Sequence, residues 1–433
     1  MQKPSSWNRI PAIEVPAIHK LNDRHITIPG SLSVPLLAHG NGRSYSDVCL
    51  TETGTLLLTN SLDRFISFDT NKGILRCEPG VTIGELLNLV VPRGWFLAST
   101  PGTQYATIGG AVCNDVHGKN HHSVGTFGHH VTSLELWRSS GEILECSASK
   151  NPNLFKATIG GMGLTGLIRW VEIQLSPIKS AWMWVESHRF RNLREFWEIN
   201  KEFEASWPYT VAWIDCLAKN QERGRGILYA GKHTDSKNRH TNKSIRPFKI
   251  PVNPPFSLIN TVSLKVFNEI YYRQKTSPNG ISTHYIPYFY PLDKIENWNK
   301  FYGRKGFYQY QCVIPPENAF DAINEILDVI ANNNTGSFLA VLKKFGDMPS
   351  IGMISFPRPG ITFALDFPNS GPKTLNLLAK LDQIVKQSGG ALYPAKDARM
   401  PAEMFELSFP NLDNFIKYID PVFSSSFWRR VRK

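Results

Sequence analysis

Residues Asp115 to His130 form the stretch "DVHGKNHHSVGTFGHH", which holds five histidines, one lysine and three glycines. Histidine and aspartate are common zinc ligands, yet this spacing matches no familiar zinc pattern, and the glycines disfavour a helix that would present ligands four residues apart. We therefore expect no metal site. Four of the histidines are expected to be polar loop residues that bond backbone groups: His121, His122, His129 and His130. The functional interpretation concerns His117 and Lys119.

Three lysines are candidates for binding or proton transfer. Lys119 has a flexible stem and three donors, which suits an anionic or hydroxyl-rich ligand, although a surface lysine is the ordinary alternative. Lys396 in "YPAKDAR" follows an apolar strand, and Asp397 and Arg399 beside it are expected to orient it. A lysine kept neutral by burial can accept a proton from an alcohol, which makes Lys396 the first choice as catalytic group; a loop ion pair is the alternative.

Strand periodicity selects further candidates. On the alternating strand "LAVLKKFG", only one of Lys343 and Lys344 can point inward, and we expect Lys343 to do so. Gln309 and Gln311 lie two residues apart in "YQYQCVIP" and therefore share one strand face. Two amides on one face suit sugar hydroxyls, while an exposed sheet face is the plain alternative.

Three glycine-rich turns carry the strongest signal for a bound group. They are "AHGNGRSYSD" (38–47), "TPGTQYATIGGAV" (100–112) and "GGMGLTG" (160–166). Exposed N–H groups in such turns form concave anion sites, and glycine lets a phosphate approach the backbone. The third turn matches G-x-G-x-x-G, but a helix-like run precedes it and a strand follows, which excludes a Rossmann site. We expect Gly42, Gly109 and Gly163 to converge on one diphosphate.

The composition of the whole chain limits the partners. A net charge of +12 and a pI near 9.3 favour an anionic partner, while no nucleic-acid module signature is present. Six cysteines without a CxxC pair indicate reduced thiols. No signal peptide or membrane-spanning run is evident, so we expect a cytoplasmic protein. The polar, basic, proline-rich segment 231–256 is expected to be a mobile surface loop that could contact a membrane.

The pattern of strands and helices indicates an α+β protein. The first part predicts short strands and glycine turns, a helix from Thr82 to before Pro92, a hairpin over 131–147 and a half-buried strand over 167–175. From about residue 180, aromatic strands alternate with amphipathic helices, such as those beginning near Pro316 and Thr374.

The ordered motifs resemble the vanillyl-alcohol-oxidase-type flavoproteins. "HGNGRSYSD" is similar to their pyrophosphate loop, and "PGTxxxTIGGAV" to their second flavin loop. "HGKNHHSVGTFG", "GGMGLTG", "FYQYQCVIP" and "YPAKDAR" resemble the decaprenylphosphoryl-β-D-ribose 2′-oxidase group within them, in the same order and over nearly the whole chain. The resemblance implies a two-subdomain PCMH-type FAD-binding domain, 1–178 and 391–433, with an inserted antiparallel-sheet-plus-helices substrate domain, 179–390.

The resemblance also implies roles for individual residues. Lys396 and Tyr45 would be catalytic, while Lys119, Gln309, Gln311 and Lys343 would bind substrate. The FAD contacts that it implies are Gly40, Asn41, Gly42, Arg43, Ser44, Tyr45, Pro101, Gly102, Thr103, Thr107, Gly109, Gly110, Ala111, Asn114, His117, Asn120, Gly163, Thr165, Gly166, Ile168 and Tyr393.

The implied reaction is oxidation of the 2′-hydroxyl of a polyprenyl-phosphoryl-β-D-ribose to the 2′-keto sugar by hydride transfer to flavin N5. A separate NAD(P)H-dependent short-chain reductase would then complete an epimerisation to the arabinose donor. An alternative is a sugar-1,4-lactone or alditol oxidase that acts on soluble sugars.

Two positions depart from relatives. Arg43 stands where several members carry a histidine bonded to the flavin, so non-covalent FAD is expected. Ala364 stands where some members have a cysteine, so we expect no thiol-directed inactivation there.

Overall fold

The computed structural model describes residues 3–235 and 248–432, and the fold is α+β, as expected. The chain begins with a small parallel sheet of three strands in the order β1-β3-β2. These strands are β1 (Ala17–Lys20), β2 (Leu36–His39) and β3 (Thr55–Leu58). Turn residues close each of these short apolar runs, so the sheet delivers the first glycine turn at the end of β2.

A five-stranded antiparallel sheet follows in the order β4-β5-β9-β7-β8. Its strands are β4 (Phe65–Asp69), β5 (Ile74–Cys77), β7 (Val131–Trp137), β8 (Ile143–Ser147) and β9 (Leu167–Gln174). The hairpin β7–β8 and the helix α1 (Ile83–Val90), which a capping box of Thr82 and Glu85 begins, are as expected.

The prediction of a strand over 167–175 is confirmed by β9, but the strand is half-buried only from Val171 onward. β9 lies between β5 and β7, and Leu167 through Val171 are all buried. Alternation predicts one buried face, but a central strand that is covered on both sides buries both. The helix α4 (Pro152–Thr158) ends just before the turn 160–166, which then enters β9. The order helix, turn, strand is the one that argued against a Rossmann site.

The middle of the chain forms an eight-stranded sheet, which is antiparallel and ordered β15-β11-β13-β12-β18-β19-β17-β20. Its strands are β11 (Trp182–Phe190), β12 (Tyr209–Ile214), β13 (Gly226–His233), β15 (Ile281–His284), β17 (Phe307–Ile314), β18 (Val341–Phe345), β19 (Gly360–Pro368) and β20 (Ala391–Leu392).

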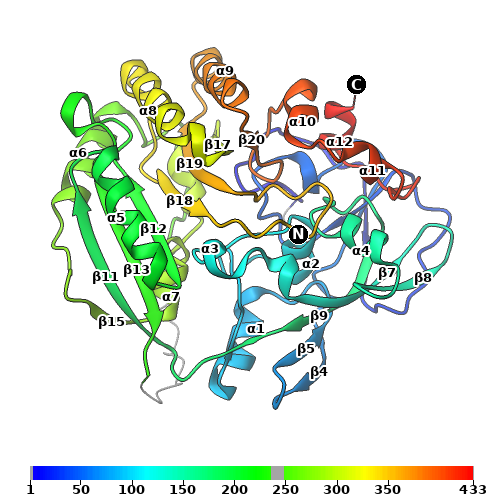
Figure 1. The fold of residues 1–433 in the computed structure, drawn as a ribbon. Coiled ribbons are helices and arrows are strands. Elements are labelled where there is room, and N and C mark those ends of the chain that lie inside the picture. The colour runs from blue at the N-terminus through cyan, green and yellow to red at the C-terminus, as the bar shows by residue number, and fades with distance from the viewer. Residues whose placement is uncertain (1–2, 236–247, 433) are drawn as a thin grey trace.

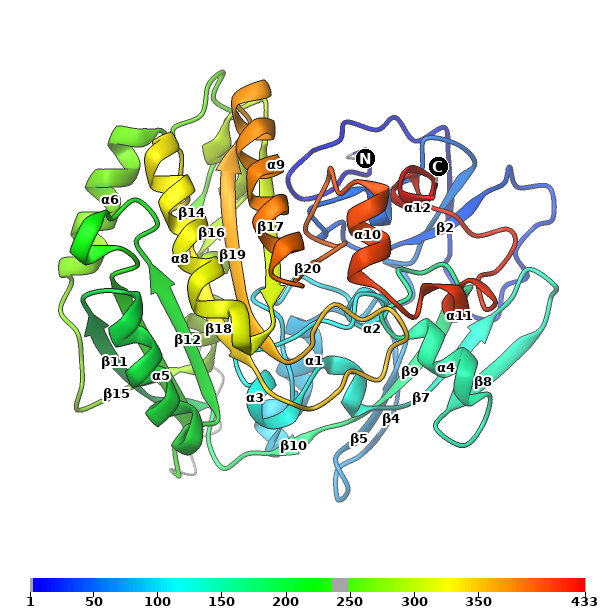
Figure 2. The ribbon, with the colours of Figure 1, turned by 45° about the horizontal axis from the view of Figure 1, so that its top comes forward.

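Three helices cover one face of this sheet: α5 (Leu193–Ser206), α8 (Pro316–Asn333) and α9 (Pro372–Gln387) (Figures 1 and 2). α8 buries the apolar stripe that its sequence predicts, including Ile323, Ile326 and Ile330. Each such side chain contributes about 1.5–3 kcal/mol when fully buried. The helices thereby seal one face, and the opposite face is left for a ligand.

The last segment returns to the first part of the chain. Its helices are α10 (Ala402–Ser408), α11 (Leu412–Ile416) and α12 (Ser426–Val431), which lie beside the N-terminal strands in Figure 2. β20 pairs with β17 of the large sheet, while Phe423 bridges to Leu36 of β2. The segment therefore joins both parts. The boundaries at 178 and 390 stay a prediction.

The remaining elements are β6 (Trp95–Phe96), β10 (Ser176–Pro177), β14 (Phe248–Lys249), β16 (Ile295–Glu296), α2 (Ile108–Cys113), α3 (His121–Val124), α6 (Thr261–Arg273) and α7 (Tyr285–Phe289). The expected loop 231–256 begins too early, because Gly231 to His233 pair with β11 and β12 in the sheet. Residues 236–247 of that expectation lie outside the described residues.

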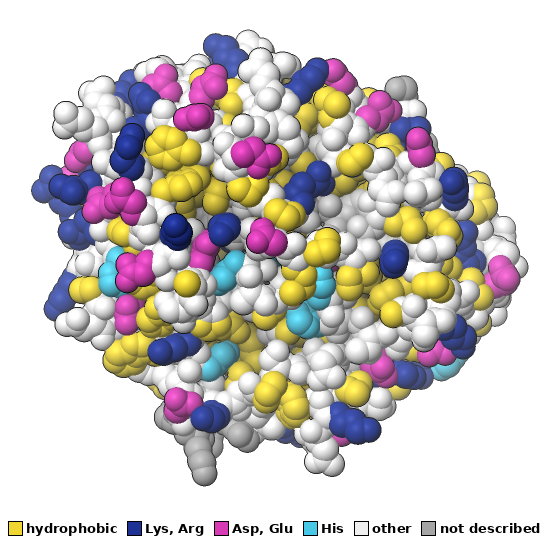
Figure 3. Space-filling model, viewed as in Figure 1, with side chains coloured by type: hydrophobic (Ala, Val, Ile, Leu, Met, Phe, Trp, Pro, Cys, Tyr) yellow, Lys and Arg dark blue, Asp and Glu magenta, His cyan; other side chains and the backbone are white. Residues whose placement is uncertain are grey.

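The surface of the face in Figure 3 mixes basic and acidic side chains. Among the described residues, no helix has the length and apolar character needed to cross a bilayer.

The joint between the first and last segments depends on a buried ion pair. Arg138 donates to the carbonyls of Thr165 and Tyr418, and Asp420 lies 3.3 Å from its guanidinium with a side chain only 1% exposed. Asp420→Ala should lower the free energy of unfolding by about 3–5 kcal/mol, because it leaves a buried charge unpaired. Denaturant unfolding of the purified protein measures this change.

The matched control is Glu145→Ala, which removes an exposed ion pair with Lys150. That change should cost less than about 1 kcal/mol. Equal losses from the two variants would show that the joint does not depend on this pair.

Candidate active site

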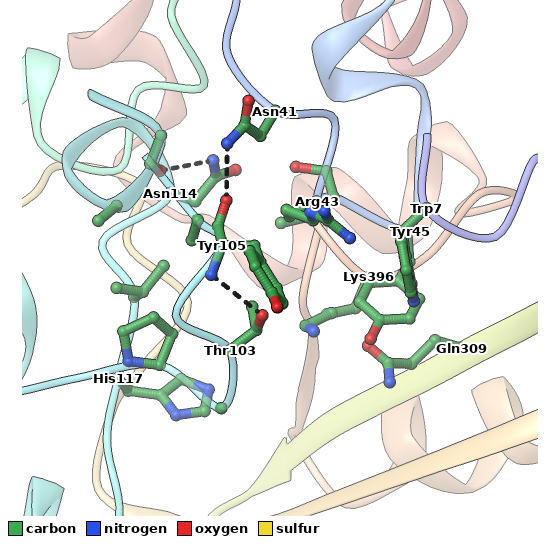
Figure 4. A pocket seen from close by; sticks show the side chains of 18 of the residues that line it. Trp7, Asn41, Arg43, Tyr45, Thr103, Tyr105, Asn114, His117, Gln309 and Lys396 are labelled. Atoms are coloured by element: carbon green, nitrogen blue, oxygen red, sulfur yellow. Dashed lines mark hydrogen bonds between the residues drawn. The ribbon is translucent and has the colours of Figure 1, made fainter. Parts of the chain in front are cut away.

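One large cavity of about 850 Å³ lies between the glycine turns and the open face of the large sheet (Figure 4). Gly42, Gly109 and Gly163 all line it, as the convergence of the three turns requires. Strands β12, β17, β18 and β19 line the other side through residues such as Val211, Gln311 and Thr362. The volume is in the range of about 300–1,000 Å³ that small-molecule sites occupy.

The first turn is shaped to present its backbone to a ligand. Gly42 has a left-handed φ of +57°, and a Cβ there would lie 2.3 Å from the carbonyl oxygen of Ser5, so glycine is required. Within the described residues, the N–H groups of Gly42, Arg43 and Ser44 make no hydrogen bond to protein. They are therefore available to an anionic group.

The second and third turns complete this cradle. Asn114 donates to the carbonyl of Gly110, whereas its Oδ1 is buried and without a partner among the described residues. Gly163 is buried with φ +75°, and a Cβ there would meet nothing within 4 Å, so it would project into free space. An unpaired acceptor, free N–H groups and a glycine floor fit an extended cofactor with a diphosphate.

Arg43 stacks against two aromatic rings at the rim. Its guanidinium carbon lies 4.3 Å from the ring centroid of Trp7 and 5.0 Å from that of Tyr105. This side chain is a half-buried cation and offers no nucleophile for a covalent flavin bond.

Two predicted cofactor residues do not line the cavity. Asn120 donates to the carbonyl of Ala98 at 2.6 Å, and the hydroxyl of Thr165 shares a hydrogen bond of 2.9 Å with that of Thr158. Both are buried supports of the turns, because a short polar side chain in a tight turn bonds nearby chain first. All other residues for which we expected FAD or substrate contacts line the cavity, as do Lys396 and Tyr45.

Lys343, His117 and Gln311 form a buried hydrogen-bonded chain. The Nζ of Lys343 lies 2.6 Å from Nδ1 of His117 and donates to the carbonyl of Gly118 at 2.7 Å. The Nε2 of Gln311 lies 3.0 Å from Nε2 of His117 and donates to the hydroxyl of Thr362. Lys344 points the other way and pairs with Glu204, as alternation predicts.

The hydrogen bonds among Lys343, His117 and Gln311 determine which nitrogen atoms carry protons. An amide nitrogen only donates, so Nε2 of His117 accepts from Gln311 and the neutral ring carries its proton on Nδ1. The N–H at Nδ1 of His117 then donates a hydrogen bond to Nζ of Lys343. Only an uncharged amine can accept this bond, so Lys343 must be neutral. Burial lowers the pKa of both Lys343 and His117 well below their ordinary values, in agreement with two neutral groups.

A second cluster surrounds Lys396. Its Nζ lies 4.0 Å from the ring centroid of Tyr45, and Gln309 donates to Asp366 at 2.8 Å (Figure 4 shows Lys396, Tyr45 and Gln309). Burial lowers the pKa of Lys396 to about 8, against the opposite effect of the Asp366 carboxylate, and raises the pKa of Asp366 to about 7. A lysine of this kind can hold or accept a proton near neutral pH.

The expected orienting partners of Lys396 are wrong. Arg399 forms a two-pronged ion pair with Asp382 at 2.6 and 2.8 Å and also contacts Asp397 at 3.3 Å. Neither Asp397 nor Arg399 lines the cavity, and together with Asp382 they form a separate buried network. The carboxylate that faces Lys396 comes instead from β19, through Asp366.

Lys119 also lines the cavity. Its ammonium donates to the carbonyl of Tyr288 and lies 4.2 Å from the centroid of that ring. Burial lowers its pKa to about 7. The cavity therefore holds three lysine amines, of which Lys119 and Lys396 can carry a charge near neutral pH, and such a charge suits an anionic ligand.

Several lining residues were missed from the sequence, above all Asp293 and Asp366. Asp366 shares the inward face of β19 with Ala364 and Thr362, so period-two alternation could have found it. Asp293 accepts from the hydroxyl of Thr103 and the N–H of Gln104. It lies in the short 3₁₀ helix Pro291–Lys294, 190 residues from Thr103, and so short an element carries no periodic signal.

The histidine string is structural apart from His117. Nδ1 of His121 accepts from the N–H of Gly346, and Nε2 of His122 lies 2.9 Å from the carbonyl oxygen of Trp207. No cluster of three or more metal-ligand side chains occurs in residues 3–235 and 248–432.

Thiol chemistry at the cavity is also limited. Ala364 lines it where some relatives of the expected group carry a cysteine. Cys49 and Cys113 line it too, but burial raises the pKa of each thiol to about 12, so neither is a reactive thiolate.

Comparison with known proteins agrees with this geometry. Residues 25–147 match an FAD binding domain. The chain is 33% identical to decaprenylphosphoryl-β-D-ribose oxidase of Mycolicibacterium smegmatis over 92% of its own length and 89% of the relative's. This chain belongs to the decaprenylphosphoryl-β-D-ribose oxidase family. It is therefore an FAD-dependent oxidoreductase of the PCMH type.

More distant relatives share less of the chain. An uncharacterized protein of Streptomyces coelicolor is 27% identical over 81% of this chain and the whole of the relative. Bovine L-gulonolactone oxidase is 30% identical, but over only 32% of this chain and 31% of its own length. The similarity to the oxidase of M. smegmatis thus extends over the substrate side of the cavity as well.

Gly163 provides a test of the cofactor cradle. Gly163→Ala should lower the flavin content of the purified protein several-fold, because its methyl group projects into the cavity. The ratio of visible flavin absorbance to protein absorbance measures this content.

Gly141→Ala is the matched control, since Gly141 also has a positive φ, +90°, and open space around it, but lies in the exposed turn between β7 and β8. Both variants carry the backbone strain of about 1–2 kcal/mol. Equal flavin contents in the two variants would contradict the claim that the turn at Gly163 holds the cofactor.

Proposed function

We propose that this chain oxidises the 2′-hydroxyl of a polyprenyl-phosphoryl-β-D-ribose to the 2′-keto sugar. The observation that carries the proposal is the cavity that Lys396, Gln309, Gln311 and Lys119 share with the glycine cradle. Two amides suit the hydroxyls of a sugar, and the protonated amine of Lys119 suits a phosphate. The family membership of the whole chain supports the same substrate class.

Each side chain of the cavity has a separate role in the proposed reaction. Gln309 and Gln311 orient the sugar through its hydroxyls, and Lys119 pairs with the phosphate. Lys396 accepts the proton of the 2′-hydroxyl, and the carboxylate of Asp366 stabilises the resulting ammonium. Bound FAD supplies the acceptor, at N5, of the hydride that leaves C2. The Lys343–His117–Gln311 chain holds Gln311 and the ring of His117 in place.

The cofactor is held without a covalent bond in this proposal, because Arg43 occupies the position of the linking histidine. Precipitation of the purified protein with acid should release all of its flavin into the supernatant. Flavin that stays with the pellet would contradict the proposal.

A 2′-keto sugar returns to a sugar of the opposite configuration only by reduction. A separate NAD(P)H-dependent short-chain reductase is therefore the partner that we propose for an epimerisation. The alternative activity, oxidation of soluble sugar lactones or alditols, has support only from the similarity of the FAD-binding part to enzymes such as L-gulonolactone oxidase. Flavin reduction by a short-chain phosphoryl-ribose, compared with free lactones, separates the two.

Lys396 is the residue on which the reaction depends. Lys396→Met should lower turnover by about 100- to 10,000-fold with normal flavin content, because the proton acceptor is lost. In the native protein kcat/KM should rise through pH about 8, since the amine is neutral above its pKa. Lys396→Arg keeps the charge but cannot lose a proton, so it should be equally impaired. A fully active arginine variant would mean that the residue only donates hydrogen bonds.

Lys119 should make substrate binding depend on pH. Its pKa is near 7, so its charge is lost as the pH rises and the Kd for a short-chain substrate should increase above that value. Calorimetric titration between pH 6 and 8 would measure the increase. Lys119→Met should flatten it, whereas Asp366→Asn, which removes the other group that titrates near pH 7, should leave it.

A further inference from the structure

Helix α6 exposes an apolar stripe although it is firmly held on its inner side. A capping box of Asn260 and Ser263 begins the helix, and the buried Asn268 donates to Asp215 at 2.6 Å. The outer positions follow a four-residue spacing. Val262, Val266 and Ile270 are 72%, 55% and 67% exposed.

The segment before α6 exposes further large apolar side chains. Its large apolar side chains are between 44% and 69% exposed: Phe248, Val252, Phe256 and Leu258. The segment is tied to the body of the protein, because Arg304 donates to the carbonyl of Pro254 and Leu258 donates to that of Phe301. We call the exposed side of 248–258 and α6 the apolar face. Contiguous exposed apolar side chains of this size mark an interaction site.

The charges around the apolar face are mainly positive. Residues 248–273 carry three basic side chains and one acid, Glu269. Glu269 forms ion pairs with Arg225 and Arg273, and Lys249 forms one with Glu296. Lys265 is exposed between the apolar positions of α6, and Arg304 is exposed beside Pro254. Lysine and arginine next to exposed apolar side chains are typical of helices that lie in an anionic bilayer surface.

The apolar face also borders the cavity. Tyr271 of α6 lines the cavity, packs 4.6 Å from Trp213 and shares a hydrogen bond of 3.0 Å with Tyr229. Ile295 and Glu296 line it as well, and they pair in β16 with Phe248 and Lys249 of β14. The inner side of the same elements therefore forms the wall of the substrate site.

We propose that the apolar face docks on the surface of an anionic lipid bilayer, so that a membrane-held substrate enters the cavity beside α6. The proposal rests on the proposed function in one respect: a lipid-linked substrate explains why a bilayer should lie next to the cavity. A second copy of the chain would not require basic side chains among the apolar ones, because like charges would then meet at the interface.

The test compares vesicle binding by the FAD-loaded protein and by a variant with Val262→Gln, Val266→Gln and Ile270→Gln. Glutamine preserves helix propensity, and the three positions are exposed, so the fold should be unchanged. Sedimentation with vesicles of phosphatidylglycerol and phosphatidylcholine should show at least tenfold weaker binding of the variant. Vesicles of phosphatidylcholine alone should bind the native protein more weakly, since they lack the negative charge.

The matched control carries glutamine at Ile18, Ile143 and Leu407, which are 48%, 51% and 53% exposed and lie outside the apolar face. This variant should bind vesicles as the native protein does. Equal binding by both variants, or no binding by the native protein, would overturn the proposal. A concentration-dependent dimer that the α6 variant abolishes would also overturn it in favour of a second copy.

Turnover separates this proposal from the proposed function. The α6 variant should oxidise a water-soluble, short-chain phosphoryl-ribose at the native rate and lose rate only with a long-chain substrate in vesicles. If the native protein binds vesicles but oxidises neither substrate, the proposed oxidation is contradicted and the docking proposal stands. Turnover of both substrates at native rates by the α6 variant would remove the docking alone.

Discussion

Burial of three amines around one cavity is the constraint on which the site depends. Lys119, Lys343 and Lys396 would each lose a large hydration energy if they stayed charged away from water. The protein meets this cost by different means. Lys343 gives up its proton and becomes part of a neutral chain with His117 and Gln311. Lys119 contacts an aromatic ring and a carbonyl oxygen. The charged form of Lys396 is favoured by the negative charge of Asp366.

Burial leaves the pKa of Lys119 near 7 and that of Lys396 near 8, whereas Lys343 is held neutral. An amine that is half protonated at physiological pH can both take up a proton and return it, whereas an ordinary surface lysine cannot. The burial that lowers the pKa of these lysines is therefore also what suits them to proton transfer. The helices on the far side of the large sheet matter for this reason, since they keep the interior behind Gln309, Gln311 and Lys343 dry.

The two walls of the cavity come from different sheets, and the last segment of the chain holds them together. β20 pairs with β17, Tyr45 donates its N–H to the carbonyl of Ala395, and Ser46 donates to that of Pro394. Lys396 therefore sits where the glycine cradle and the substrate strands meet. Tyr271 of α6 lines the same space, so the apolar face and the cavity share one helix.

The sequence by itself determined the local features. Glycine turns, capping residues and period-two alternation predicted the cradle, the α+β class, the inward Lys343 and the shared face of Gln309 and Gln311, because these depend on neighbours in the chain. Ordered motifs also identified the family. The tertiary structure alone decided what distant segments bring together: Asp366 rather than Asp397 beside Lys396, Asp293 against Thr103, and the exclusion of Asn120 and Thr165 from the cavity. The longest of these contacts joins residues 190 positions apart, and no local pattern records which of two polar side chains will find its partner across the fold.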